Sequence, residues 1–81
     1  MRIDVKLFAV LRERAGTEQL SLDVGEGARV GDAVEAIGHR FPSIRDLLPR
    51  VAFAVNRGYV KSDAKLTDGD ELALIPPVSG G

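Results

Sequence analysis

The sequence predicts an α+β fold, with a mixed β-sheet and one main helix packed on one face of that sheet. Two segments near the N-terminus alternate apolar and polar residues, as half-buried strands do. The following segment changes to the period of an amphipathic helix. Further strand-like segments, bounded by turn residues, complete the chain.

The first two strands are expected to form an antiparallel hairpin. In residues 2–8, Ile3, Val5 and Leu7 alternate with polar residues, and in residues 19–24, Leu20, Leu22 and Val24 do the same. The segment 9–15 between them ends at a turn signal, Gly16-Thr17, and this short gap favours a hairpin.

The main helix is predicted from the spacing of its apolar residues. These residues follow a helical period and give one stripe to bury: Val30, Ala33, Val34, Ile37 and Phe41. Pro42 ends the helix, because proline has no amide hydrogen and restricts the residue before it.

The remaining segments complete the sheet. Residues 44–48 are expected to form a short turn, and the continuous apolar run 51–55 suits a central strand covered on both faces. Asn56-Arg57-Gly58 predicts a tight turn, followed by a strand fragment at 59–60. A second turn at 67–70 leads into a last strand at 71–75, which Pro76-Pro77 ends.

The predicted order is therefore β-β-α-β-β, with a short extra strand and with the last strand beside the first. This is the plan of ubiquitin-like β-grasp domains. We expect residues 1–76 to form that domain and residues 77–81 to form a flexible Gly-Gly tail.

Size and composition exclude several classes of protein. Eighty-one residues suit a single domain with one core. The chain has no cysteine and one histidine, so the usual zinc ligands are lacking. Eleven basic and twelve acidic residues are scattered, which argues against nucleic acid as a partner. No apolar run is long enough to span a membrane and no signal peptide opens the chain, so we expect a soluble cytoplasmic protein.

The conventional catalytic candidates are weak. His39 lies on the polar side of the predicted helix with no partner in view, so a solvated surface histidine is expected. Asp68, Asp70 and Glu71 lack the ligand alternation of a calcium loop, and a reverse turn explains them. Gly25 and Gly27 are not followed by the Lys-Ser/Thr of a phosphate-binding loop. We therefore expect no metal site and no bound cofactor.

The C-terminal tail, Val78-Ser79-Gly80-Gly81, is the strongest candidate for chemistry. It follows two prolines and could extend about 17 Å from Pro77, and its two glycines have no β-carbon to block a narrow channel. Its carboxylate is unreactive until activated. Attack on the α-phosphate of ATP would give an acyl-adenylate, from which sulfur or an amine could displace AMP. This chain offers no base or phosphate site for either step, so a partner would use the ATP.

Three segments carry a resemblance to a known family. They are residues 5–16 (VKLFAVLRERAG), residues 54–56 (AVN) and residues 66–81 (LTDGDELALIPPVSGG). Together they closely resemble the MoaD-type sulfur carriers, the small subunits of molybdopterin synthase in the MoaD/ThiS ubiquitin-like family. The resemblance covers essentially the whole chain.

The resemblance implies a sulfur carrier in molybdenum cofactor biosynthesis. Gly81 would be adenylated by a MoeB-type enzyme and converted to a thiocarboxylate with a sulfur donor protein. The tail residues Val78, Ser79 and Gly80 would enter a MoaE-type large subunit, in a heterotetramer, and sulfur would pass there to cyclic pyranopterin monophosphate. The active site is therefore expected on the large subunit, and this chain would be a non-catalytic carrier.

The resemblance also marks Phe8, Tyr59 and Ile75 as apolar residues on the partner-facing surface. Phe8 follows the inward-pointing Leu7, so strand alternation turns it outward and favours the interface. For Tyr59 and Ile75, core packing and partner contact remain equally open.

Other functions fit the same Gly-Gly end. One is a carrier for thiazole synthesis or tRNA thiolation, although such carriers are generally shorter and lack the LFA-x-LRE segment. Another is a ubiquitin-like modifier joined to lysines, which needs the same adenylation. A third is a plain interaction domain, in which Gly81 would be dispensable.

Overall fold

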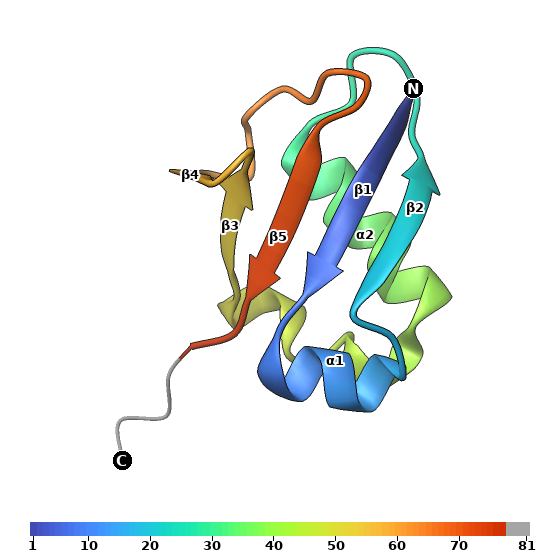
Figure 1. Ribbon diagram of the computed structural model, residues 1–81, viewed down its shortest axis with the longest axis vertical. Coiled ribbons are helices and arrows are strands. Elements are labelled where there is room, and N and C mark those ends of the chain that lie inside the picture. The colour runs from blue at the N-terminus through green and yellow to red at the C-terminus, as the bar shows by residue number, and fades with distance from the viewer. Residues whose placement is uncertain (78–81) are drawn as a thin grey trace.

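The computed structural model describes residues 1–77 and consists of a five-stranded sheet with helices on one side (Figure 1). The predicted α+β class is confirmed. No helix in this part of the chain is long and apolar enough to cross a membrane. The elements are β1 (Arg2–Leu7), α1 (Ala9–Ala15), β2 (Gln19–Asp23), α2 (Val30–Arg40), two 3₁₀ turns (Pro42–Ile44 and Leu48–Arg50), β3 (Ala52–Val55), β4 (Gly58–Val60) and β5 (Glu71–Ile75).

The sheet is mixed, with the strand order β2-β1-β5-β3-β4. β1 pairs antiparallel with β2, as the hairpin prediction required, and parallel with β5. β3 pairs antiparallel with both β5 and β4. The prediction that the last strand lies beside the first is therefore confirmed, and β5 occupies the middle of the sheet.

The core lies between the sheet and α2, which crosses behind the strands in Figure 1. The α2 stripe contributes Val30, Ala33 and Ile37, all fully buried, as the helical spacing predicted. The helix begins after Arg29, whose amide donates a hydrogen bond of 2.9 Å to Oδ2 of Asp32. The strands supply the opposite wall, made by Ile3, Val5, Leu7, Leu20, Leu22, Leu72 and Leu74.

The connection between β1 and β2 contains a helix that the sequence analysis did not identify. Leu11 anchors α1 in the core and is fully buried. Gly16 ends the helix at a φ of 78°, and its amide donates to the carbonyl of Arg12, which is the usual left-handed helix end. The residues 9–15 are mostly good helix formers, and this was the available signal.

The prediction that the run 51–55 is covered on both faces is wrong. β3 has a neighbouring strand on each side, but only one of its faces meets the helices. Phe53 and Val55 pack against the core, whereas Ala52 is exposed on the opposite face. Alanine counts as apolar in a sequence pattern but is small enough to lie on an open sheet face.

Candidate functional site

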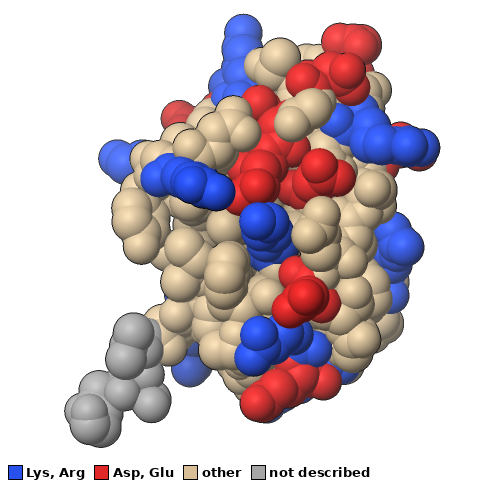
Figure 2. Space-filling model, in the orientation of Figure 1, with Lys and Arg blue, Asp and Glu red and all other residues tan. Residues whose placement is uncertain are grey.

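The open face of the sheet, on the side away from α2, divides into a charged part and an apolar part. The strand register places Ser21, Asp4 and Glu71 side by side across β2, β1 and β5. The next row crosses the sheet through Lys6, Ala73, Ala54 and Tyr59. Figure 2 shows this face, with acidic side chains gathered over β1 and β5, a basic side chain over the end of β3 next to β4, and uncharged surface below it, over the other end of β3 and the end of β5.

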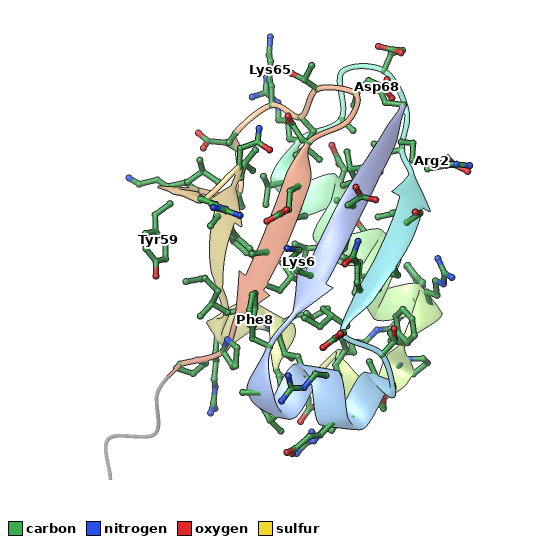
Figure 3. The ribbon with its side chains drawn as sticks, in the orientation of Figure 1. Arg2, Lys6, Phe8, Tyr59, Lys65 and Asp68 are labelled. Carbon is green, nitrogen blue, oxygen red and sulfur yellow. The ribbon has the colours of Figure 1, made fainter. Side chains whose placement is uncertain are left out.

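A shallow hollow of about 260 Å³ occupies the apolar part of this face. Ala54 and Ala73 are register partners on β3 and β5, and their methyl side chains leave space between larger neighbours. Phe8 and Tyr59 border it with exposed fractions of 43% and 76% (Figure 3). We call this the open-face hollow; its lining residues are Lys6, Phe8, Ala54, Arg57, Tyr59, Glu71, Ala73 and Ile75.

Backbone strain borders the open-face hollow. Among residues 1–77, the non-glycine residues with positive φ are Ala9 at 50°, Asn56 at 50° and Arg57 at 71°. Ala9 follows Phe8 directly and turns the chain from β1 into α1. Asn56 and Arg57 form the loop that leads to Tyr59. Left-handed conformations cost non-glycine residues about 1–2 kcal/mol, and such strain tends to be kept at functional sites.

The acidic turn that resembles a cation site is held together by its own hydrogen bonds. Asp70 accepts bonds from the Asn56 side chain at 2.9 Å and from the Thr67 amide at 2.7 Å. Asp68 accepts from the Arg2 amide at 2.8 Å, and Glu71 lies 3.4 Å from the Lys6 amine. Within the described part of the chain, no three potential ligands gather as a metal ion would need. The turn is therefore a structural junction.

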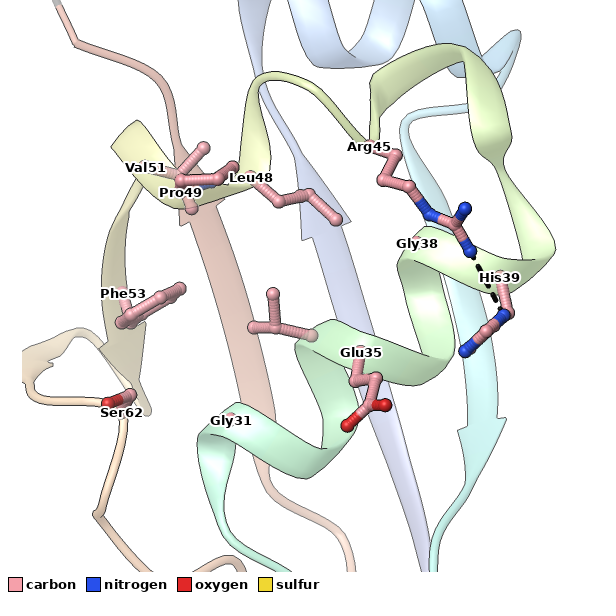
Figure 4. A pocket seen from close by; sticks show the side chains of 11 residues that line it. Gly31, Glu35, Gly38, His39, Arg45, Leu48, Pro49, Val51, Phe53 and Ser62 are labelled. Carbon is pink, nitrogen blue, oxygen red and sulfur yellow. Dashed lines mark hydrogen bonds between the residues drawn. The ribbon is translucent and has the colours of Figure 1, made fainter.

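A larger hollow, of about 600 Å³, lies on the other side of the molecule, between α2 and β3 (Figure 4). Val34, Leu48 and Phe53 give it an apolar lining. At one end the Arg45 guanidinium lies 3.0 Å from Nδ1 of His39. His39 is solvent-exposed, as predicted, and its contact is a cation rather than an acid or a nucleophile.

The structure brings three of the proposed site residues together. Phe8, Tyr59 and Ile75 all border the open-face hollow. The side chains of Tyr59 and Ile75 lie on the open face and not in the core, and their contact with a partner stays a prediction. The other proposed residues, Val78, Ser79, Gly80 and Gly81, lie outside the described residues.

The sequence analysis did not single out four of the lining residues: Lys6, Ala54, Arg57 and Ala73. Period-2 alternation within residues 71–75 places Ala73 on the same face as Ile75, so this signal was available. Nothing in the local sequence pointed to Ala54 or Arg57, because their place depends on the pairing of β3 with β4 and β5.

Comparison with known proteins adds independent evidence. Residues 5–81 match the ThiS family. The molybdopterin synthase sulfur carrier subunit of Chlamydomonas reinhardtii is 40% identical over 83 residues and is covered completely, as is this chain. The subunit of that name from Mycobacterium tuberculosis is 35% identical, with 100% of this chain and 99% of the relative covered.

A solved structure agrees with the fold. The crystal structure of SAMP1 from Haloferax volcanii matches over the whole of both chains, with a TM-score of 0.92 and 34% sequence identity. The predicted ubiquitin-like β-grasp fold is thereby confirmed.

Proposed function

This chain belongs to the ThiS family, and from that premise we propose that it is the sulfur carrier of molybdopterin synthase. The observation that carries the proposal is the full-length similarity to relatives named as molybdopterin synthase sulfur carrier subunits. The open-face hollow supports it, because a carrier needs a surface by which partner proteins recognise it before they act on its end.

We propose that the chemistry takes place at the C-terminal carboxylate of Gly81. The carboxylate attacks the α-phosphate of ATP on a MoeB-type enzyme and releases pyrophosphate. Sulfide-level sulfur from a donor protein then attacks the acyl carbon and displaces AMP, which leaves a thiocarboxylate. The carrier next delivers this sulfur to cyclic pyranopterin monophosphate on a MoaE-type large subunit. ATP is thus used by the activating partner, and the carrier itself holds no cofactor.

We propose that the open-face hollow docks on the large subunit. Phe8, Tyr59 and Ile75 surround a floor of two alanines, so a partner can insert an apolar side chain there. Ile75 is also the last residue of β5, and Pro76 and Pro77 follow it directly. The hollow and the start of the tail are therefore adjacent, and a protein that binds the hollow is well placed to receive Val78, Ser79 and Gly80. A large-subunit dimer with one carrier at each end would form the heterotetramer.

The first test is the intact mass of the protein. The chain is incubated with ATP, a MoeB-type enzyme and a sulfur donor, and the expected result is the exchange of one oxygen for sulfur at the C-terminus. A variant that lacks Gly81 serves as the control and should stay unchanged. An unmodified wild-type chain, alongside an authentic carrier that the same enzymes do modify, contradicts the proposal.

A second test separates the molybdenum pathway from other uses of sulfur. The thiocarboxylated chain is mixed with a MoaE-type large subunit and cyclic pyranopterin monophosphate, and formation of the dithiolene product is measured. Transfer to a thiazole precursor or to tRNA, without transfer to the pterin, would instead assign the chain to one of those pathways.

A ubiquitin-like modifier is the second candidate, and one observation favours it. The Haloferax volcanii protein that matches with a TM-score of 0.92 is SAMP1, and the curated small archaeal modifier protein 1 of that organism is 37% identical to this chain. The discriminating result is an amide bond between Gly81 and a lysine of another protein, detected by mass spectrometry after the adenylation step.

A further inference from the structure

Arg57 occupies a position in the β3–β4 hairpin where glycine is usually favoured. β3 ends at Val55 and β4 begins at Gly58, so Asn56 and Arg57 form a two-residue loop. Both residues have positive φ, as the hairpin turns that match strand twist require. Asn-Gly is the preferred pair for such a turn, and arginine in the second place adds strain without a packing gain, because Arg57 is exposed.

Arg57 lines the open-face hollow, and the nearby carboxylates are engaged elsewhere. Both oxygens of Asp70 accept hydrogen bonds, from Asn56 and from the Thr67 amide. Glu71, which also lines the hollow, lies 3.4 Å from the Lys6 amine. Among residues 1–77, the ion pairs are formed by Arg2, Lys6, Arg12 and Arg14, and Arg57 is not among them. The cation therefore faces solvent without a carboxylate to neutralise it in the described part of the chain.

We propose that Arg57 is a specificity-determining residue of this hollow, which pairs with a carboxylate of the large subunit and thereby fixes how that subunit docks. The inference rests on the proposed function. It deepens that function by assigning the chemistry of the partner's surface: an apolar side chain for the alanine floor and an acidic side chain beside it.

Two features make the pairing specific. An arginine can hold a carboxylate through two parallel hydrogen bonds, which fixes direction as well as distance. The hairpin backbone also holds Arg57 on one side of the hollow, while Phe8 lies at the end of β1, so the charged and apolar contacts are separated in space. A partner that offers only an apolar group, or a cation at the facing position, fits poorly.

Substitutions at one position separate the charge from the strain. Arg57→Gln removes the charge and keeps a side chain on the left-handed backbone, so the strain remains. Arg57→Lys keeps both the charge and the strain. Arg57→Gly removes both, and Lys65→Gln is the matched control, since Lys65 is exposed and does not line the hollow. Binding of each full-length variant to a MoaE-type large subunit is measured by calorimetry at low and high salt, and each Tm is recorded.

The expected dissociation constants rise about tenfold for Arg57→Gln and Arg57→Gly, and Lys65→Gln should keep the wild-type value. Arg57→Lys should fall between them, because it keeps the charge and loses the two parallel hydrogen bonds. The wild-type affinity should weaken with salt more steeply than that of Arg57→Gln. Relief of about 1 kcal/mol of strain in Arg57→Gly should raise Tm by about 4–8 °C, and this combination of greater stability with weaker binding is not what a purely structural arginine would give.

The outcomes distinguish the two levels of the proposal. Tight wild-type binding with unchanged affinity and salt dependence in Arg57→Gln overturns the role of Arg57 and leaves the carrier function standing. If the wild-type chain does not bind the large subunit, while the large subunit's own carrier does bind it, both the role of Arg57 and the carrier function are overturned. A loss of binding in Lys65→Gln equal to that in Arg57→Gln reduces the effect to net charge and overturns the specific pairing.

Discussion

The side-chain amide of Asn56 donates a hydrogen bond of 2.9 Å to Oδ1 of Asp70, and this bond joins two segments that are far apart in the sequence. Asn56 Oδ1 also accepts from the Glu71 amide at 3.0 Å, and the Asn56 amide donates to the Glu71 carbonyl at 2.8 Å. The hairpin loop is thus locked to the start of β5. Both segments belong to the motifs that carry the family resemblance, so those motifs share a structural role.

Replacement of Asp70 by alanine should weaken this lock. The variant loses the bonds from Asn56 and Thr67, and we expect the free energy of unfolding to fall by about 2 kcal/mol. Urea denaturation followed by circular dichroism measures the change. Asp63→Ala is the control, because within residues 1–77 Asp63 accepts a hydrogen bond through its backbone carbonyl and not through its side chain. Equal stabilities for the two variants would show that the lock contributes little.

Phe8→Ala should reduce partner affinity more than stability. The ring is partly exposed on the open face, and its burial by a docked large subunit is worth about 1–3 kcal/mol, or roughly 5- to 150-fold in the dissociation constant. Leu47→Ala provides the opposite case, because Leu47 packs against the core and does not line the open-face hollow. It should lower Tm and leave affinity unchanged. The reverse pattern would place the interface elsewhere.

The two glycines that flank Glu26 should respond in opposite ways to alanine. Gly25 has no positive φ, and a β-carbon at this position would meet only open space. Gly25→Ala should therefore stabilise the fold by about 0.4–1 kcal/mol, because alanine lowers the conformational entropy of the unfolded chain. Gly27 has a φ of 79°, and Gly27→Ala should cost about 1 kcal/mol or more. Thermal unfolding of the pair checks both signs. A stabilised Gly27→Ala variant would mean that this loop adopts another conformation in solution.

Extension of the chain by one alanine after Gly81 should abolish the thiocarboxylate and spare the fold. The proposed reaction needs the carboxylate of Gly81 itself at the activating enzyme's site, whereas the described core ends before the tail. The measurement is intact mass after the sulfur-transfer incubation, with Tm as the test of folding. An extended chain that is still modified at the wild-type rate is the result that this proposal does not allow.

The sequence predicted those parts of the fold that depend on local periodicity. The stripe of Val30, Ala33 and Ile37 placed α2, and alternation in residues 2–8 turned Phe8 outward. Periodicity did not predict α1, because a helix of seven residues makes only about two turns. It also buries one residue, Leu11, so no repeating apolar stripe is visible. The sequence pattern also misread β3, where Ala52 is apolar in the sequence but lies exposed on the open face.

The site was predictable in part. Family resemblance selected Phe8, Tyr59 and Ile75, and the structure places all three around one hollow. The alanine floor and the charge of Arg57 depend on which strands become neighbours, and a single sequence does not reveal that pairing. The bond between Asn56 and Asp70 is of the same kind, since it links residues 14 positions apart through a loop that has no periodic pattern.

The central position of β5 has a consequence for how the protein is made. Without this strand, β1 and β2 have no hydrogen-bonded contact with β3 and β4. β5 follows all the other strands along the chain, so the two halves of the sheet can join only after this strand has been synthesised. A chain that stops before β5 therefore lacks Ala73 and Ile75 and cannot assemble the open-face hollow.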